Sequence, residues 1–319
     1  MAAAAVQIGA SRAAAADPTQ VTARATDQVA TLRNSISARL KSVLRGMFGQ
    51  INPHDQRQVD QFAVRGAQQL GAAQQVMARA SAAGMAKQLG AVGVKVTPKP
   101  DVPLDVRGGS VTVTPSGLLT IERKPVTVHY DNGDVAHITP EGMTTEAVLK
   151  RPASGFRWII SEDGTEDDAQ NRSGLIIDSV VDNNLLLADR LAAQQVIAQA
   201  VNLDEARGVE PRITGYRRVI HPELSRTGTC GLCIAASDRI YKWSKLMPIH
   251  DHCHCGIAPV TEEHDPGGSL NNLDLSTLYD HGGGTSAAHL KRTKYQVDEH
   301  GELGAVLKPA KPYKSRTSK

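Results

Sequence analysis

Residues 228–255, GTCGLCIAASDRIYKWSKLMPIHDHCHC, contain all four cysteines of the chain. A Cys230-x-x-Cys233 pair is followed, after sixteen residues, by a dense run of histidine and cysteine between His250 and Cys255. Zinc is usually held by four sulfur or nitrogen ligands in a tetrahedron, and a C-x-x-C turn supplies two of them. The other two must come from a distant segment, so the ion would join loops that cannot hold each other alone. The pattern predicts a structural zinc knuckle, meaning two loops tied at one ion.

The second half of the ligand set is less well defined than the first. Cys230 and Cys233 are the expected first pair, whereas five residues compete for two further positions, namely His250, His252, Cys253, His254 and Cys255. We expect His250 and Cys255 to complete the set, with Cys253 as the substitute. Because side chains alternate along an extended chain, Cys253 and Cys255 would share one side. Reduced thiols without metal, or disulfides, are the alternatives.

The amino-terminal stretch bears on the redox state of these cysteines. MAAAAVQIGASRAAAAD has neither the basic start nor the leucine-rich centre of a signal peptide. The sequence also has no run of about 18 apolar residues, so it predicts no membrane span and no membrane contact. We therefore expect synthesis in a cytosol, where thiols stay reduced and clustered cysteines indicate metal or chemistry.

The composition limits the kind of core that the chain can build. Hydrophobic residues make up 40% of its 319 residues, but many of them are alanine, and aromatic residues make up only 3%. Large side chains supply most of the burial free energy. The composition favours an α+β fold that is mainly α, with long helices, thin seams and an elongated shape.

Residues 1–92 are expected to form a helical arm. Asp17-Pro18 and Asp55 are helix-start signals, and Gly49 and Asn52-Pro53 should end the first helix. Between them, apolar residues recur at helical spacing, which predicts an antiparallel helical hairpin. Helices so poor in leucine need a covering surface, so we interpret the pair as an interaction arm, with a plain helical subdomain as the alternative.

The periodicity changes after Gly93. Residues 93–140 contain short β-branched runs separated by proline and glycine, which predicts a β-rich insert of about four to six strands. The runs are Val94–Thr97, Ser110–Thr114, Leu118–Glu122, Val126–Tyr130 and Val135–Ile138. Asn132-Gly133 indicates a hairpin turn, and His129 and His137 are expected to face solvent.

Residues 141–212 carry the densest aliphatic run and are the expected helical core, with Phe156 and Trp158 packed beneath it. The run comprises Leu175, Ile176, Val180, Leu185, Leu187, Leu191, Val196 and Ile197. The metal-binding module follows over residues 213–262. Residues 263–319 are expected to be a loop-rich tail, and its last stretch, 308–319, carries five basic residues and no acidic one.

Residues 215–260 resemble a known family. The stretch GYRRVIHPELSRTGTCGLCIAASDRIYKWSKLMPIHDHCHCGIAPV is similar to the C-terminal module of phage minor head proteins of the Mu F-like head morphogenesis family, in the form found in tailed phages of actinobacteria. The shared motif is a C-x-x-C followed by a proline-containing lead into H-x-x-C-x-C. Its positions here are Cys230, Cys233, Pro248, His250, Cys253 and Cys255. Specific matching covers about residues 213–305.

The resemblance implies a structural protein without enzymatic activity. Such a protein is made in the host cytoplasm, enters the virion in few copies, docks at the portal vertex, and aids head assembly or DNA packaging and delivery. Its partners would be the portal protein and capsid or scaffold proteins. We expect the knuckle to hold Arg217, Arg218 and Trp243 as a contact surface, with solvated side chains at Arg217 and Arg218 as the alternative. The basic 308–319 tail is interpreted as a solvated disordered end, and weak, salt-sensitive contact with packaged DNA is its alternative.

Two enzymatic alternatives stay open. The order His252, Asn272, His281 loosely matches an HNH-type nuclease, in which such residues hold one catalytic metal ion. A capsid maturation cysteine protease would instead use Cys230 or Cys253 beside His250.

Overall fold

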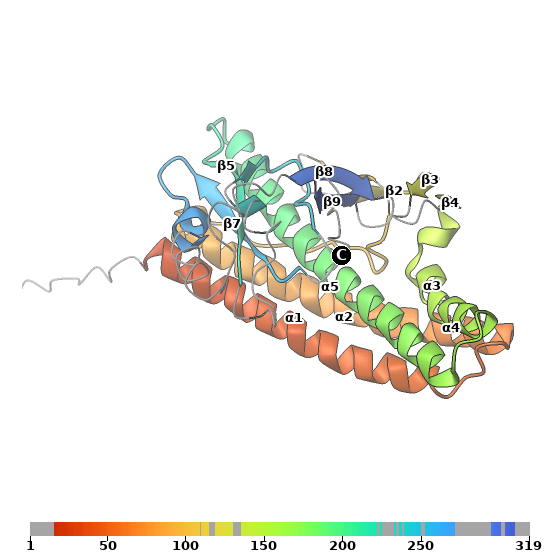
Figure 1. Cartoon of the computed structure of the whole chain (residues 1–319). Helices are drawn as coiled ribbons and strands as arrows, with labels where there is room; N and C mark the ends of the chain where they lie inside the picture. The colour runs from red at the N-terminus through yellow and green to blue at the C-terminus, as the bar shows by residue number, and fades with distance from the viewer. Residues whose placement is uncertain are drawn as a thin grey trace, which may run out of the picture.

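Three long helices organise the fold (Figure 1). They are α1 (Pro18–Phe48), α2 (Gln56–Ala91) and α5 (Glu166–Ala206). The computed structural model describes residues 16–108, 110–114, 119–129, 135–221, 224, 233, 236–237, 239–249, 253–271, 295–300 and 304–309. Within these residues the protein is mainly helical with a few short strands, as the sequence predicts.

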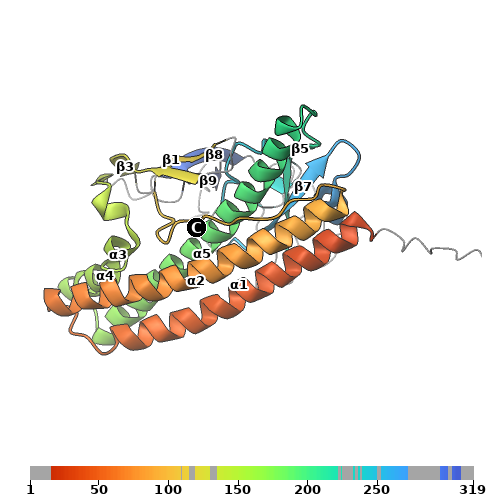
Figure 2. The same cartoon turned by 180° about the vertical axis from the view of Figure 1, so that it is seen from behind.

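Both amino-terminal helices begin where the sequence predicts. The Asp17 carboxylate accepts a hydrogen bond from the Thr19 backbone N–H at 3.0 Å, and Pro18 occupies the first helical position. The Asp55 carboxylate does the same for the second helix, and Gly49 closes the first. These caps satisfy backbone groups that a helix end leaves unpaired. The antiparallel pair of helices is confirmed (Figures 1 and 2).

Helix α5 covers the apolar faces of α1 and α2. One hydrophobic cluster draws on all three helices, and its larger members include Leu44, Phe48, Phe62, Leu70, Met77, Ile177, Val181, Leu185 and Leu191. The covering surface that the expected arm needs is thus supplied by the chain itself. The helices of residues 1–92 and those of residues 141–212 share one core.

A polar seam joins α1 to α5. Arg33 binds Asp189 at 2.6 Å, and four-residue steps along α1 bring the next polar side chains to the same face. The remaining bonds run from Ser37 and Lys41 to Asp182, and from Arg45 to Asp178. Residue numbers rise along α1 as they fall along α5, so the two helices are antiparallel.

A short helical segment closes one end of the bundle. It contains η1 (Glu141–Met143), α3 (Thr145–Val148) and α4 (Arg151–Ser161). Phe156 of α4 is buried as expected, but Trp158 is 56% exposed and Leu175 of α5 is 61% exposed. The expectation that Trp158 and Leu175 join the core is therefore wrong. Two residues along a helix turn a side chain by about 200°, so Phe156 and Trp158 face opposite ways.

The insert over 93–140 consists of two separate antiparallel hairpins. Their strands are β1 (Ser110–Val113), β2 (Leu119–Glu122), β3 (Val126–His129) and β4 (Val135–Ile138). His137 is exposed, as expected, whereas Asn132 and Gly133 lie outside the described residues.

The predicted strand Val94–Thr97 is wrong, because that stretch pairs with no other strand. The chain just after it runs along α5 instead. There Gln199 exchanges hydrogen bonds with the backbone of Lys99, and Gln195 accepts one from the Asp101 N–H at 2.9 Å. Helix side chains thus take the place of a neighbouring strand.

A three-stranded antiparallel sheet in the order β6-β5-β7 lies against the other end of the bundle (Figure 2). Its strands are β5 (Ile213–Val219), β6 (Ile240–Tyr241) and β7 (Gly256–Thr261). The region expected as a loop-rich tail also holds a hairpin, formed by β8 (Tyr295–His300) and β9 (Gly304–Pro309). Within the described residues, no helix combines the length and apolar character needed to cross a membrane.

Strand β7 approaches α1 closely at Gly256. A Cβ atom at this position would lie 2.9 Å from the Thr26 Cβ and 3.3 Å from the His221 Nε2. Both distances are too short for a side chain without displacement of its neighbours. Gly256 therefore sets how near the sheet can come to the first helix.

The polar seam yields a stability prediction. Asp189→Ala leaves the buried Arg33 guanidinium without its counter-ion, which should cost about 3–5 kcal/mol of unfolding free energy. Asp178→Ala is the matched control on the same helix, because its partner Arg45 is half exposed, and it should cost less than about 1 kcal/mol. Urea unfolding followed by circular dichroism measures both. Equal losses for the two variants would contradict a buried ion pair as the stronger contact.

Candidate metal centre

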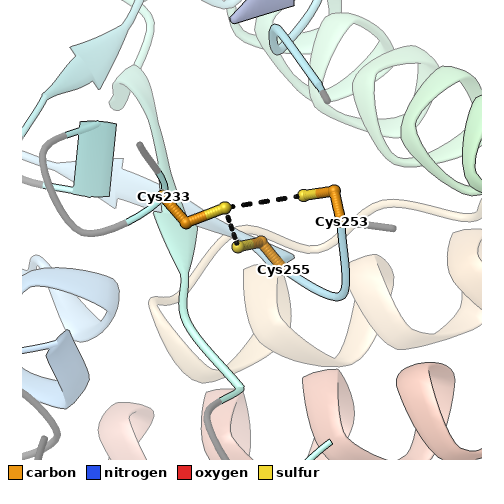
Figure 3. A group of neighbouring side chains, drawn as sticks. All are labelled: Cys233, Cys253 and Cys255. Atoms are coloured by element: carbon orange, nitrogen blue, oxygen red, sulfur yellow. Dashed lines mark hydrogen bonds between the residues drawn. The ribbon is translucent and has the colours of Figure 1, made fainter. Parts of the chain in front are cut away.

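Three cysteines from two distant segments meet beside the sheet (Figure 3). Cys253 and Cys255 lie on the chain that leads into β7, and Cys233 has helical backbone geometry and lies between β5 and β6 in the sequence. All three are buried, at 2% exposed for Cys233, 4% for Cys253 and 3% for Cys255. In Figure 3 their sulfur atoms point toward one another.

The spacing of the sulfur atoms fits a tetrahedral metal. The Sγ atoms of Cys255 and Cys233 are 3.3 Å apart, and those of Cys233 and Cys253 are 3.8 Å apart. Sulfurs bound to one zinc ion at about 2.3 Å lie about 3.8 Å from each other. A disulfide needs about 2.05 Å between its sulfurs, and none of the three cysteines forms one. The donor set therefore suits a thiophilic divalent ion such as zinc.

The cluster rests on the long central helix. Leu186 of α5 and Ile249 belong to the same buried group as Cys233, Cys253 and Cys255. These apolar neighbours exclude water from one side of the sulfur atoms. Burial of this kind makes thiol–metal bonds less accessible to competing ligands.

A buried arginine faces the sulfur atoms. Arg218 lies on β5, the central strand of the sheet, and is 0% exposed. Its Nη1 donates toward the Sγ of Cys253 at 3.2 Å and the Sγ of Cys233 at 3.5 Å, and its Nη2 donates to the Pro248 carbonyl. Burial lowers the pKa of Arg218, but the sulfurs of Cys255, Cys233 and Cys253 raise it more, so the net pKa shift is upward. The guanidinium thus keeps its charge in this environment.

The pKa of the Cys255 thiol is raised. The hydrogen bond with Cys233 lowers the pKa of the Cys255 thiol, but the hydrogen bond with Cys253 and burial raise it, to about 12 overall. A reactive nucleophile needs an accessible thiol with a depressed pKa. These properties suit a metal ligand, which is deprotonated by the ion itself, better than the nucleophile of a protease.

The loop 243–249 leads toward the second cysteine segment. Side chains of α5 and β5 hold this loop by donating hydrogen bonds to its backbone carbonyl groups. From α5, Gln194 donates to the Trp243 carbonyl at 3.1 Å and Arg190 donates to the Met247 carbonyl at 2.6 Å. From β5, Tyr216 donates to Lys245 and Arg218 donates to Pro248. These anchors were not predicted from the sequence. The available signal was the polar pair Arg190 and Gln194, four residues apart within an aliphatic run.

The predicted ligands are brought together in part. Cys233 and Cys255 belong to the cluster, and Cys253, expected only as a substitute, is an equal member. Among the described residues the potential metal ligands grouped here are these three cysteines, and His254 is not one of them. Cys230, His250 and His252 lie outside the described residues, so their roles stay predictions. So do the nuclease residues Asn272 and His281, which also lie outside.

The predicted contact surface requires a correction. Arg218 is fully buried, and Arg217 is nearly so because both its Nε and Nη2 donate to the Asp265 carboxylate. Strand β5 is covered on both faces, so successive side chains point into the protein in either direction. Arg217 and Arg218 are thus interior residues instead of the exposed surface expected from the sequence. Trp243 is partly buried against a second apolar cluster, which includes Tyr216, Tyr241 and Met247, and its contact with a partner stays a prediction.

No family model matches the chain, and comparisons with curated proteins and with solved structures find no match. The chemistry of the site is therefore inferred from its side chains, which are three thiols and one buried guanidinium beside them.

Removing one donor should remove metal. We expect the purified full-length protein to contain about one zinc ion per chain, and Cys253→Ala to contain much less because one of the three described donors is gone. A chelator should lower the melting temperature of the wild type, since ion binding adds to folding free energy. Elemental analysis and thermal melting measure these effects.

Ile249→Ala is the matched control for Cys253→Ala. Ile249 lies in the same buried cluster but offers no ligand atom. The variant should melt at a lower temperature because of the cavity and still contain stoichiometric zinc. Full metal content in Cys253→Ala, or a wild type free of metal that ignores chelation, would contradict the metal centre.

Proposed function

We propose that this chain is a structural minor head protein of a tailed phage, without enzymatic activity, whose C-terminal module is cross-linked by a zinc ion. The observation that carries the proposal is the convergence of Cys233, Cys253 and Cys255 at one buried point. These are three of the positions at which residues 215–260 resemble the Mu F-like head morphogenesis family. The ion would tie the helical backbone at Cys233 to the segment leading into β7.

The form of the bundle supports a docking role. Helices α1, α2 and α5 contain 31, 36 and 41 residues, which makes them about 45 to 60 Å long. The sheet lies toward one end of this bundle, and α3 and α4 lie at the other (Figure 1). The three-cysteine cluster packs on Leu186, near the middle of α5. A long helical bundle with a metal cross-link beside it suits a protein that positions itself on a larger assembly.

The proposed setting is the portal vertex of the capsid. The protein would be made in the host cytoplasm and enter the virion through contact with the portal protein and with capsid or scaffold proteins. Residues 308–319, with five basic side chains, would add weak contact with packaged DNA, because neutralising few phosphates gives salt-sensitive binding.

Virion composition tests this proposal. Particles of a phage that encodes the chain, purified on a density gradient, should contain it in few copies, detected by mass spectrometry. Detergent-opened particles should release it together with the portal ring. A Cys253→Ala/Cys255→Ala phage should incorporate less of it, because the metal cross-link is lost, whereas the Asp178→Ala variant should incorporate normally. A chain abundant in lysates and missing from purified particles would overturn the proposal.

A nicking assay separates the nuclease alternative. The proposal predicts no cleavage of supercoiled plasmid by the purified protein with magnesium or manganese. Cleavage that disappears in His252→Ala would favour the nuclease.

A further inference from the structure

Arg218 is a buried cation with an unusual set of neighbours. Several arginines of the described residues pair with carboxylates, as Arg33 does with Asp189, Arg212 with Asp204 and Arg217 with Asp265. The ion pairs found in the described part of the chain include none for Arg218. Its hydrogen-bond acceptors are instead two sulfur atoms and one carbonyl oxygen.

A buried charge without a counter-ion is strongly unfavourable. Three thiolates around a divalent cation carry one excess negative charge, and the guanidinium cancels it. The group of Arg218, Cys233, Cys253 and Cys255 is therefore neutral as a whole when a divalent ion is bound to the three thiolates.

We infer that Arg218 is a positioning residue of the metal centre, which neutralises the three-thiolate site and orients two of its sulfur ligands. The inference rests on the metal site of the proposed function and deepens it. According to this inference, the metal centre needs a fixed positive charge on a side chain that does not itself bind the ion.

The geometry of the guanidinium explains why arginine occupies this position. Its planar fork presents several N–H donors in fixed directions. Nη1 reaches the Sγ atoms of both Cys233 and Cys253, while Nη2 reaches the carbonyl of Pro248. One side chain thus joins the two cysteine segments and the intervening loop. N–H donors to metal-bound sulfur stabilise the thiolate and hold it in orientation.

The central strand keeps the guanidinium in place. The backbone of Arg218 pairs with Ile257 of β7, and its carbonyl accepts a hydrogen bond from the Asn271 side chain at 2.7 Å. Strand β7 itself begins directly after Cys255. The strand that carries the charge and the strand that follows the ligands are therefore fixed to each other by backbone bonds.

The test measures zinc affinity of full-length proteins at one pH by competition with a chromophoric chelator. The neutral variants Arg218→Met and Arg218→Gln should bind zinc about 10- to 100-fold more weakly than the wild type, the range typical for loss of an outer partner. Arg218→Lys keeps the charge but loses the fork, so its affinity should fall between those of the wild type and the neutral variants. With cobalt in place of zinc, the thiolate-to-cobalt absorption of the variants should shift.

Arg217→Met is the matched control, because it removes the adjacent arginine of the same strand and its bonds to Asp265. It should melt at a lower temperature while retaining wild-type zinc affinity, which separates a general loss of packing from an effect on the ion. If Arg218→Met does not fold, Arg218→Gln and Arg218→Lys provide the comparison.

The outcomes distinguish this inference from the proposed function. A wild type that binds zinc, together with a neutral Arg218 variant of equal affinity and unchanged cobalt spectrum, overturns the role of Arg218 alone. A wild type that binds no zinc overturns both the metal centre and the role of Arg218. Weaker binding in the Arg218 variants only, with Arg217→Met unaffected, supports the inference.

Discussion

The satisfaction of buried polar groups along α5 is the constraint on which the rest of the structure depends. Such groups need partners away from water, and here the partners come from α1, α2 and the loop 243–249. Aspartates of α5 bind α1, Asn184 binds Gln74 of α2, and Arg190 and Gln194 hold the loop before the cysteine segment. Apolar burial alone would allow these elements to slide. The polar bonds fix their register, and with it the position of the sulfur atoms.

Local signals in the sequence were sufficient to predict structural features that depend only on residues close together in the chain. The helix starts at Asp17 and Asp55 follow from capping chemistry over three residues, and both were predicted. The convergence of Cys233 with Cys255 was predicted from ligand spacing. By contrast, Val94–Thr97 has the composition of a strand, but its neighbourhood is decided by glutamines about a hundred residues away on α5. No local pattern contains that information.

The site shows the same division between local and distant information. Residue types and spacing identified the thiols. That Cys253 belongs to the cluster as fully as Cys233 and Cys255 could not be predicted, because it depends on the path of the chain into β7. Arg218 was noticed as a basic residue and assigned to the surface, because charged side chains are almost never fully buried unless paired. Its partners are sulfur atoms, which count as counter-charges only when they are thiolates. The structure and the chemistry had to be combined to see the role of this residue.

The tight approach at Gly256 links two parts of the molecule that are more than two hundred residues apart in the sequence. This residue leaves no room between β7 and Thr26 of α1, and the next residue toward the amino terminus is Cys255. A shift of the first helix toward the sheet therefore meets the backbone one peptide unit from a sulfur donor. The packing of the amino-terminal helix and the geometry of the thiol cluster are thus tied to each other through a single residue without a side chain.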